Sequence, residues 1–364
     1  MLSTPHLSLG PKLREFEHAV ARRVGVRHAV AVNSGTSGLH LAVKAAGLGP
    51  NDEVITTPFS FVASANCALY EGAVPRFVDI DPDTYNIDVR QIERAITRRT
   101  RAILPVHIFG RPCPMHEILE IARRRNLVVV EDACEALGAS YHGRAVGSFG
   151  QTGVFAFYPN KQITTGEGGV ITTDDQRVTA LCRSWRNQGR AEDDAWLEHE
   201  RLGYNYRLSD MNCALGAAQL SRLDAILARR TAVANRYTEI LMDRVPHVAP
   251  PAPAAPETSI SWFVYVVRLR EDFARRDRDA VLEDLRATGI GCRNYFSPIH
   301  LQPFYRQKFG FGPGDFPVAE QVSERTIALP FFGQLPDDDI LTVCDALACA
   351  IRRQKRIYAW TAAN

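Results

Sequence analysis

The stretch RAILPVHIFGRPCPMHEILEIARRRNLVVVED, residues 101–132, contains two apolar runs with a helical pattern between them. The runs at Ala102–Val106 and Leu127–Glu131 are typical of buried strands, and Pro114–Arg125 has the apolar spacing of a helix. Two strands joined through a helix predict a parallel pair that the helix covers. The stretch therefore predicts an α/β fold built on a mostly parallel sheet.

The same alternation continues on both sides of this stretch. Further strands are expected at His28–Val32, Val54–Thr57, Val74–Val78, Gly153–Phe157 and Gly169–Thr172. Further helices are expected at Pro11–Val24, Ser37–Ala46, Ser60–Tyr70 and Val89–Ile96, and a long one over Leu208–Leu227 that continues through Tyr237.

A proline- and alanine-rich stretch, VPHVAPPAPAAPETS at 245–259, interrupts this pattern and is typical of a domain boundary. Beyond it we expect a strand at Ser261–Arg268 and helices at Ala280–Thr288 and Asp337–Tyr358. The predicted organisation is a large α/β domain over 1–245, a linker over 246–259 and a small C-terminal α+β domain over 260–364.

The composition excludes several classes of protein. With 43 basic and 41 acidic residues the net charge is +2, so no overall field attracts nucleic acid or an anionic membrane. No apolar run approaches the ~18 residues of a membrane span, and no export signal is visible at the start of the sequence. The eight cysteines include no CxxC pair. They predict reduced thiols in a cytoplasmic protein, without a metal site.

Ligands of such sheets bind outside the carboxyl ends of the strands, so the residues directly after each strand are the candidates. One of these segments, Ser34-Gly35-Thr36-Ser37, joins a strand to the start of a helix. Free amides and hydroxyls at a helix N-terminus suit a phosphate group, although an ordinary helix cap explains Ser34 or Thr36 equally well. Asp132 lies at the end of another strand, where a buried carboxylate needs a cation or a cap.

Lysine is rare in this chain, since five of the 43 basic residues are lysines. Lys161 stands alone between Lys44 and Lys308, in the segment after a later strand. A lysine can lose its proton and attack a carbonyl, which an arginine cannot. From the count alone, a chance surface lysine is an equally good explanation. A phosphate turn, a strand-end Asp132 and a loop lysine together meet the needs of pyridoxal phosphate.

Longer segments carry a family resemblance. The chain resembles the DegT/DnrJ/EryC1/StrS family of pyridoxal-phosphate sugar aminotransferases, which have the fold type I (aspartate aminotransferase) architecture. The matching segments follow the family order along most of the chain: NSGTSGLHLA (33–42), TPFSFVASAN (57–66), FVDIDPDTYNID (77–88), PVHIFGRP (105–112), EDACEALGA (131–139), FAFYPNKQITTGEGG (155–169), LGYNYRLSDMNCALG (202–216) and YFSPIHLQPFY (295–305).

The resemblance implies roles around the cofactor. Lys161 is implied to carry pyridoxal 5′-phosphate as a Schiff base and to move the proton between substrate and cofactor. Asp132 is implied to pair with the pyridine nitrogen. Glu135 stands near the ring hydroxyl, where relatives often have Gln or His. Phe61 takes the aromatic position that stacks on the ring; the alternative is one more core phenylalanine. The phosphate-binding turn is implied to consist of Gly35, Thr36 and Ser37.

The resemblance implies roles for two further residues, one toward a second subunit and one toward the substrate. Asn205 matches the residue that reaches the phosphate of the neighbouring subunit, which implies a homodimer with active sites shared across the interface. His300 is implied to line the sugar-nucleotide pocket, and a structural loop histidine is an interpretation of equal weight.

The chain also departs from the family. Relatives commonly carry a further helix and a substrate-side loop before GPKLREFE, so we expect either a truncated chain or a substrate wall built otherwise. Relatives often have His at Gln188, Tyr at Phe109 and Ser at Ala156, so a substrate contact and a phosphate contact are absent. A dehydrating branch of the family has His in place of the lysine, and Lys161 argues against that branch.

The expected function is transfer of an amino group from L-glutamate to a nucleotide-linked keto-deoxysugar for glycan or antibiotic assembly. A 4-keto-6-deoxyhexose is the expected acceptor, and a 3-keto sugar is the next candidate. The alternatives are amination of a keto-cyclitol, a non-catalytic regulator that keeps the fold, and a protein left inactive by its short N-terminus.

Overall fold

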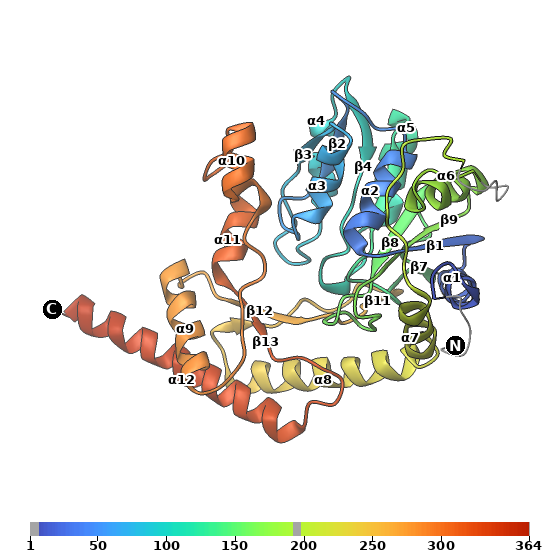
Figure 1. Cartoon of the computed structure of the whole chain (residues 1–364). Coiled ribbons are helices and arrows are strands. Elements are labelled where there is room, and N and C mark those ends of the chain that lie inside the picture. The colour runs from blue at the N-terminus through green and yellow to red at the C-terminus, as the bar shows by residue number, and fades with distance from the viewer. Residues whose placement is uncertain (1–6, 192–197, 364) are drawn as a thin grey trace.

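A computed structural model describes residues 7–191 and 198–363, with side chains described up to residue 355 (Figure 1). Within the described residues, the central sheet has the strands β1 (His28–Val32), β2 (Glu53–Thr56), β3 (Val74–Phe77), β4 (Thr100–Ile103), β5 (Val128–Asp132), β8 (Thr152–Ala156) and β9 (Gly169–Thr173). Their order across the sheet is β1-β9-β8-β5-β4-β2-β3. Neighbours from β8 to β3 pair in parallel, and β9 is antiparallel to both β8 and β1. The predicted α/β sheet is confirmed.

Helices cover both faces of this sheet. They are α1 (Pro11–Val24), α2 (Gly35–Ala45), α3 (Ala63–Tyr70), α4 (Val89–Ala95), α5 (Met115–Arg125) and α6 (Gln176–Arg186). Alternation along a strand separates two cores, because successive side chains point to opposite faces. On β5, Val130 joins the core with α2, α3 and α6, whereas Val129 joins the core with α4 and α5. The apolar side of α1 packs on the latter face, at the β1–β9–β8 end.

Local signals set the ends of the helices near the site. Helix α1 begins at Pro11 and ends before Gly25, whose φ of 79° is left-handed, so its predicted bounds are confirmed. Helix α3 begins at Ala63, three residues later than predicted. Ser60 and Phe61 therefore lie in the loop that leads into the helix.

The prediction of one long helix from Leu208 through Tyr237 is wrong. It is two helices, α7 (Asp210–Leu220) and α8 (Leu223–Arg244), separated by Ser221 and Arg222. The Ser209 side chain caps α7 by accepting from the Asn212 N–H at 3.2 Å. At the break, the Ser221 hydroxyl donates to the Ala218 carbonyl at 2.9 Å. The turn lets α7 pack against α1 while α8 runs on towards the C-terminal part (Figure 1).

The C-terminal part has its own core. Its sheet consists of β10 (Val248–Ala249), β12 (Tyr265–Leu269) and β13 (Thr326–Leu329), all antiparallel, and β11 (Thr258–Ser259) instead joins the hairpin of β6 (Ser140–Tyr141) and β7 (Arg144–Ala145). The helices are α9 (Arg275–Ala287), α10 (Pro303–Phe309), α11 (Pro317–Arg325) and α12 (Asp337–Ala363). Tyr237 of α8 stacks on Tyr265 inside this core, with ring centroids 4.9 Å apart. The predicted domain boundaries stay a prediction.

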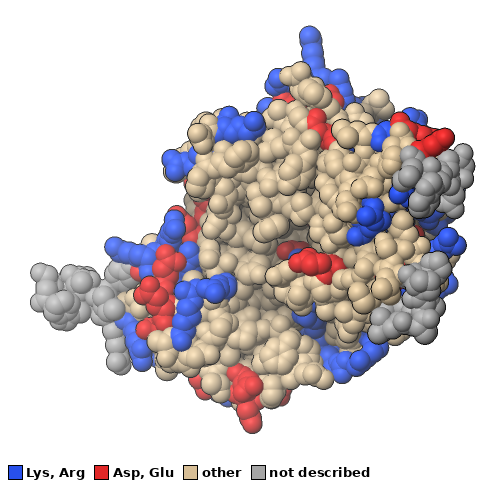
Figure 2. Space-filling model, in the orientation of Figure 1, with Lys and Arg blue, Asp and Glu red and all other residues tan. Residues whose placement is uncertain are grey.

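Charged and uncharged side chains are interspersed on the face drawn in Figure 2. Figure 2 shows a face that is hollowed near its centre, with acidic side chains at the hollow and basic ones mostly towards the edges. In the part of the chain that the structure describes, no helix is long and apolar enough to cross a lipid bilayer. The cytoplasmic location stays a prediction.

Candidate active site

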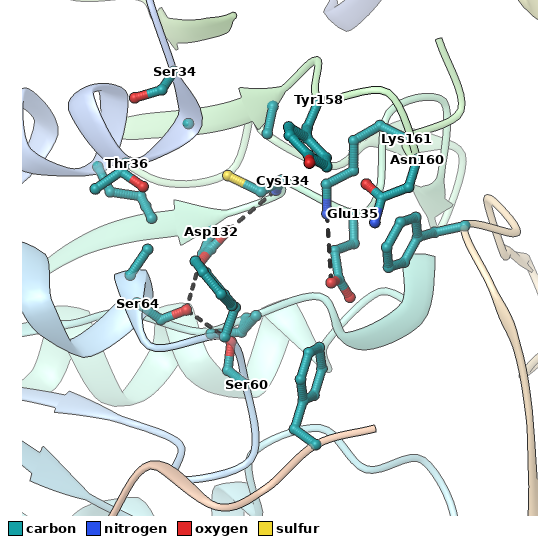
Figure 3. Close-up of a pocket in the computed structure, with 18 of the residues that line it drawn as sticks. Ser34, Thr36, Ser60, Ser64, Asp132, Cys134, Glu135, Tyr158, Asn160 and Lys161 are labelled. Carbon is teal, nitrogen blue, oxygen red and sulfur yellow. Dashed lines mark hydrogen bonds and ion pairs between the residues drawn. The ribbon is translucent and has the colours of Figure 1, made fainter. Parts of the chain in front are cut away.

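A cavity of about 500 Å³ lies at the carboxyl ends of β1, β5 and β8 (Figure 3). These three strands run in the same direction, so the segments that follow them meet at one edge of the sheet. The other wall comes from the C-terminal part of the chain, through Phe263, Tyr295 and Phe296. The cavity collects six of the residues that the sequence predicts for the site: Gly35, Thr36, Phe61, Asp132, Glu135 and Lys161.

The turn after β1 builds one end of the cavity. Ser34 caps α2 by accepting from the Ser37 N–H at 3.1 Å, and Ser34 and Thr36 both line the cavity. A Cβ on Gly35 would lie 2.7 Å from the Ala156 Cβ and 3.0 Å from the Cys134 Sγ, so only glycine allows this close packing. The free amides and the dipole of an N-terminal helix end suit a phosphate.

Ser37 lies in the same turn, and its hydroxyl is engaged by neighbouring side chains. Its hydroxyl donates to the Asn33 side-chain oxygen at 2.7 Å and lies 2.9 Å from the Ser34 hydroxyl. Ser37 is also absent from the cavity wall. Its contact with a phosphate stays a prediction, and within this turn Ser34 is the serine that lines the cavity.

The two carboxylates at the end of β5 have opposite surroundings, because neighbouring residues of a strand face opposite sides. Glu131 is fully buried and accepts three backbone N–H bonds, from Gly147, Phe149 and Gly150, at 2.6–2.7 Å. His107 lies 3.2 Å from Glu131 through Nε2, and its Nδ1 accepts from a backbone N–H. Glu131 and His107 therefore form a structural network, and Asp132 faces the cavity.

Asp132 is held by hydrogen bonds that the sequence analysis did not identify. The Ser64 hydroxyl donates to its Oδ2 at 2.7 Å, and the Ser60 hydroxyl lies 2.7 Å from that of Ser64 (Figure 3). The Cys134 N–H donates to its Oδ1 at 3.1 Å. Hydrogen bonds to both oxygens thus fix the orientation of the Asp132 carboxylate. The sequence feature that could have identified these bonds is a pair of serines four residues apart, directly after a strand and at the start of a helix.

Lys161 lies in the loop between β8 and β9, where its N–H donates to the Tyr158 carbonyl at 2.9 Å. The side chain is 13% exposed, and its Nζ lies 3.5 Å from Glu135 Oε1. The same Nζ lies 3.9 Å from the centre of the Phe263 ring. The amine therefore points into the cavity between a carboxylate and an aromatic face (Figure 3).

Phe61 is not a core residue. Its side chain is 61% exposed and lines the cavity, beyond the buried Phe59. An exposed ring at the mouth of an apolar cavity is costly unless a flat ligand or a partner covers it. Its predicted stacking on a cofactor ring is compatible with this position.

Asn205 and His300 lie outside the cavity wall. Asn205 is exposed, and its backbone oxygen accepts from the Asn33 side chain at 3.4 Å, so it lies beside the phosphate turn. His300 is fully buried, with Nε2 3.0 Å from Glu320 and its ring 4.8 Å from that of Phe316. Burial lowers the pKa of His300. Their binding roles stay predictions.

The residues present fit pyridoxal 5′-phosphate. The turn at Ser34–Thr36 suits its phosphate, Asp132 suits a protonated ring nitrogen, and Lys161 provides an amine for its aldehyde. Ser34, Gly35 and Thr36, at the N-terminus of α2, all line the cavity.

Comparisons with known proteins identify the family of the chain. The model of the DegT/DnrJ/EryC1/StrS aminotransferase family matches residues 1–348. The chain is 43% identical over 340 residues to GDP-perosamine synthase of Caulobacter vibrioides, covering 93% of this chain and 90% of the relative.

Solved structures agree as well. DesV of S. venezuelae, solved in complex with a ketimine intermediate, has a TM-score of 0.89 at 36% identity and covers 95% of this chain and 91% of its own. PseC of Helicobacter pylori, an aminotransferase involved in the biosynthesis of pseudoaminic acid, has a TM-score of 0.91 at 30% identity, covering 97% and 94%.

Proposed function

The chain belongs to the DegT/DnrJ/EryC1/StrS aminotransferase family, and on that basis we propose that it aminates a nucleotide-linked 4-keto-6-deoxyhexose with L-glutamate as donor. It is a pyridoxal-phosphate-dependent aminotransferase with the fold type I architecture. The observation that carries the proposal is one cavity that joins Lys161, Asp132 and the turn at Ser34–Thr36. The name of the GDP-perosamine synthase relative supports a sugar on a nucleotide, and a 3-keto sugar is the next candidate.

Four residues of the cavity would hold the cofactor: Ser34, Thr36, Asp132 and Lys161. The hydroxyls of Ser34 and Thr36 and the first amides of α2 would bind the phosphate. Asp132, whose orientation Ser64 fixes, would hold a proton on the ring nitrogen. Bound pyridoxal phosphate supplies the electron sink that amino transfer requires. Lys161 would hold the aldehyde carbon through Nζ and, as a free amine, would move the proton of the amino donor.

The aromatic residues control water and orientation. Phe61 covers one side of the cavity, and Phe263, Tyr295 and Phe296 line the wall from the C-terminal part. Apolar walls exclude water and strengthen the charge interactions of Asp132 and Lys161. The acceptor then enters along the side that Phe61 and Phe296 share with a second groove between α3 and α10.

The acceptor is tested by supplying keto compounds to the loaded protein with L-glutamate. We expect a GDP-linked 4-keto-6-deoxyhexose to yield one amino sugar for each 2-oxoglutarate released, measured by coupled oxoglutarate reduction and mass spectrometry. The same sugar on other nucleotides and the 3-keto isomer serve as comparisons, and an inosose represents the keto-cyclitol alternative. Turnover with the inosose and with no nucleotide sugar would contradict the proposal.

We also propose a homodimer whose active sites are shared between the subunits. Exposed apolar side chains support it: Leu202 is 83% exposed, and Met211 and Leu215 project from α7. Asn205 lies in the same segment of the chain, next to the phosphate turn, and does not line the cavity of its own subunit. A second copy of the chain related by twofold symmetry covers such a surface on both subunits.

Mixing two inactive variants tests the shared site. A dimer of one Lys161→Ala and one Asn205→Ala subunit, isolated with two different tags, has one intact site if Asn205 serves the partner's cavity. We therefore expect about half of the wild-type activity from it, well above either homodimer. If Asn205 serves its own cavity, each site of the mixed dimer keeps one defect. An inactive mixed dimer, or a monomer in sedimentation, would overturn the proposal.

A further inference from the structure

Glu135 is the carboxylate next to the Lys161 amine. It is 7% exposed in the loop after β5. Its Oε2 accepts from the Phe109 N–H at 2.9 Å, which leaves Oε1 free to face Lys161 Nζ at 3.5 Å. Figure 3 shows the two side chains pointing toward each other across the cavity wall.

The two loops that carry this pair are tied together. Gln162, the residue after Lys161, is buried and donates its side-chain amide to the backbone oxygen of Glu135. The same amide donates to the Ser261 carbonyl at 3.0 Å. The separation of Glu135 and Lys161 is therefore set by buried hydrogen bonds and not by two freely rotating surface side chains.

The charge of Glu135 depends on its surroundings. Burial raises the pKa of Glu135, while the positive charge of Lys161 and the Phe109 N–H act against this rise, and the charge of Asp132 adds to it. Tyr295 faces the carboxylate from the C-terminal part, and burial followed by the charge of Glu135 raises the pKa of Tyr295. Lys161 is thus the charged neighbour that opposes the effect of burial on the Glu135 carboxyl. Such coupling is reciprocal, so an ionised Glu135 stabilises positive charge on the Lys161 nitrogen.

We propose that Glu135 is the counter-charge of the Lys161 nitrogen and, at 3.5 Å from it, favours the protonated form of that nitrogen when it is bonded to the cofactor. This inference rests on the proposed role of Lys161 as the cofactor-binding lysine. Glu135 acts as a positioning residue, because it works through the charge of Lys161. Removing the charge of Glu135 should therefore shift the pH midpoint of the cofactor spectrum in one direction. Loss of a purely structural contact predicts no such direction.

The test is a spectroscopic titration of the loaded protein. The bound cofactor absorbs in the visible range when the bonded nitrogen is protonated and closer to the ultraviolet when it is not. Removing the negative charge with Glu135→Gln keeps an oxygen for the Phe109 N–H but no longer stabilises the proton. We expect the pH midpoint of the spectral change to move down by about one to two units. Glu167→Gln is the matched control, because Glu167 lines the same cavity but is exposed and screened by water.

The outcomes separate this inference from the proposed function. Glu135→Asp, with a shorter carboxylate, should have a midpoint between those of the wild type and Glu135→Gln, and it replaces that variant if Glu135→Gln does not retain the cofactor. A midpoint in Glu135→Gln that is unchanged, or higher than in the wild type, would overturn the role of Glu135 while Lys161 still carries the cofactor. A cofactor bound at another residue of the wild type would overturn the role of Lys161 and this inference together.

Discussion

Replacing Lys161 by arginine lowers the rate of amino transfer by at least about a thousandfold, because arginine cannot lose its proton at neutral pH. Arginine is the most stringent substitution for testing whether a neutral amine is needed. It keeps a positive charge near Glu135 and is the basic residue that this chain uses nearly everywhere else. The loss therefore reports the missing neutral amine and not a missing charge. The measurement is 2-oxoglutarate release from L-glutamate, together with the visible absorbance of protein incubated with pyridoxal phosphate.

A second lysine provides the control for this substitution. Lys308 is exposed on α10, away from the cavity wall, so Lys308→Arg should retain both the activity and the colour of the wild type. Circular dichroism checks that both variants are folded. Activity of Lys161→Arg within tenfold of the wild type would show that another group supplies the amine.

Replacing Asp132 by asparagine lowers the rate by about two to three orders of magnitude, because the amide cannot balance a positive charge on the cofactor ring. Asparagine keeps the size of the side chain and an oxygen for the Ser64 hydroxyl. The measurement is the single-turnover rate with L-glutamate, at saturating pyridoxal phosphate so that weaker binding is compensated.

Ser64 gives a smaller change of the same kind. Ser64→Ala leaves the charge of Asp132 but removes one of its hydrogen bonds, so we expect a loss of about tenfold. Ser64→Thr keeps the hydroxyl and should recover most of that rate. If Asp132→Asn reacts as fast as the wild type, the ring nitrogen does not meet Asp132 and the orientation of the cofactor given above is wrong.

Much of the large domain follows from local patterns in the sequence. The apolar spacing of Pro11–Val24, bounded by a proline and a glycine, gave α1 its bounds, and the run LVVVED gave β5 to within one residue. Helix α6 was missed, although Asp175 caps it by accepting from the N–H groups of Arg177 and Val178 at 2.7 and 3.2 Å. A capping residue is a local signal, so this helix was predictable.

Other features depend on contacts between distant segments. Nothing in the spacing of residues 208–237 shows the break at Ser221, since that break follows from packing α7 on α1 and α8 on the C-terminal core. Lys161 and Asp132 line the same cavity because they follow or end two neighbouring parallel strands, β8 and β5. Once the order of the strands is known, this proximity can be predicted. The pairing of Ser64 with Asp132 requires the actual position of α3, which the sequence does not supply.

The central claim is that the Lys161 nitrogen binds the cofactor, and reduction followed by peptide mapping tests it most directly. Borohydride fixes the bond between lysine and pyridoxal phosphate, and trypsin does not cleave after a modified lysine. We predict that the label appears on one peptide spanning residues 145–177, bounded by Arg144 and Arg177, with the mass of one reduced pyridoxal phosphate on Lys161. In unlabelled protein the same region yields the peptides 145–161 and 162–177. A label on another lysine, or none after full loading with the cofactor, would contradict the account.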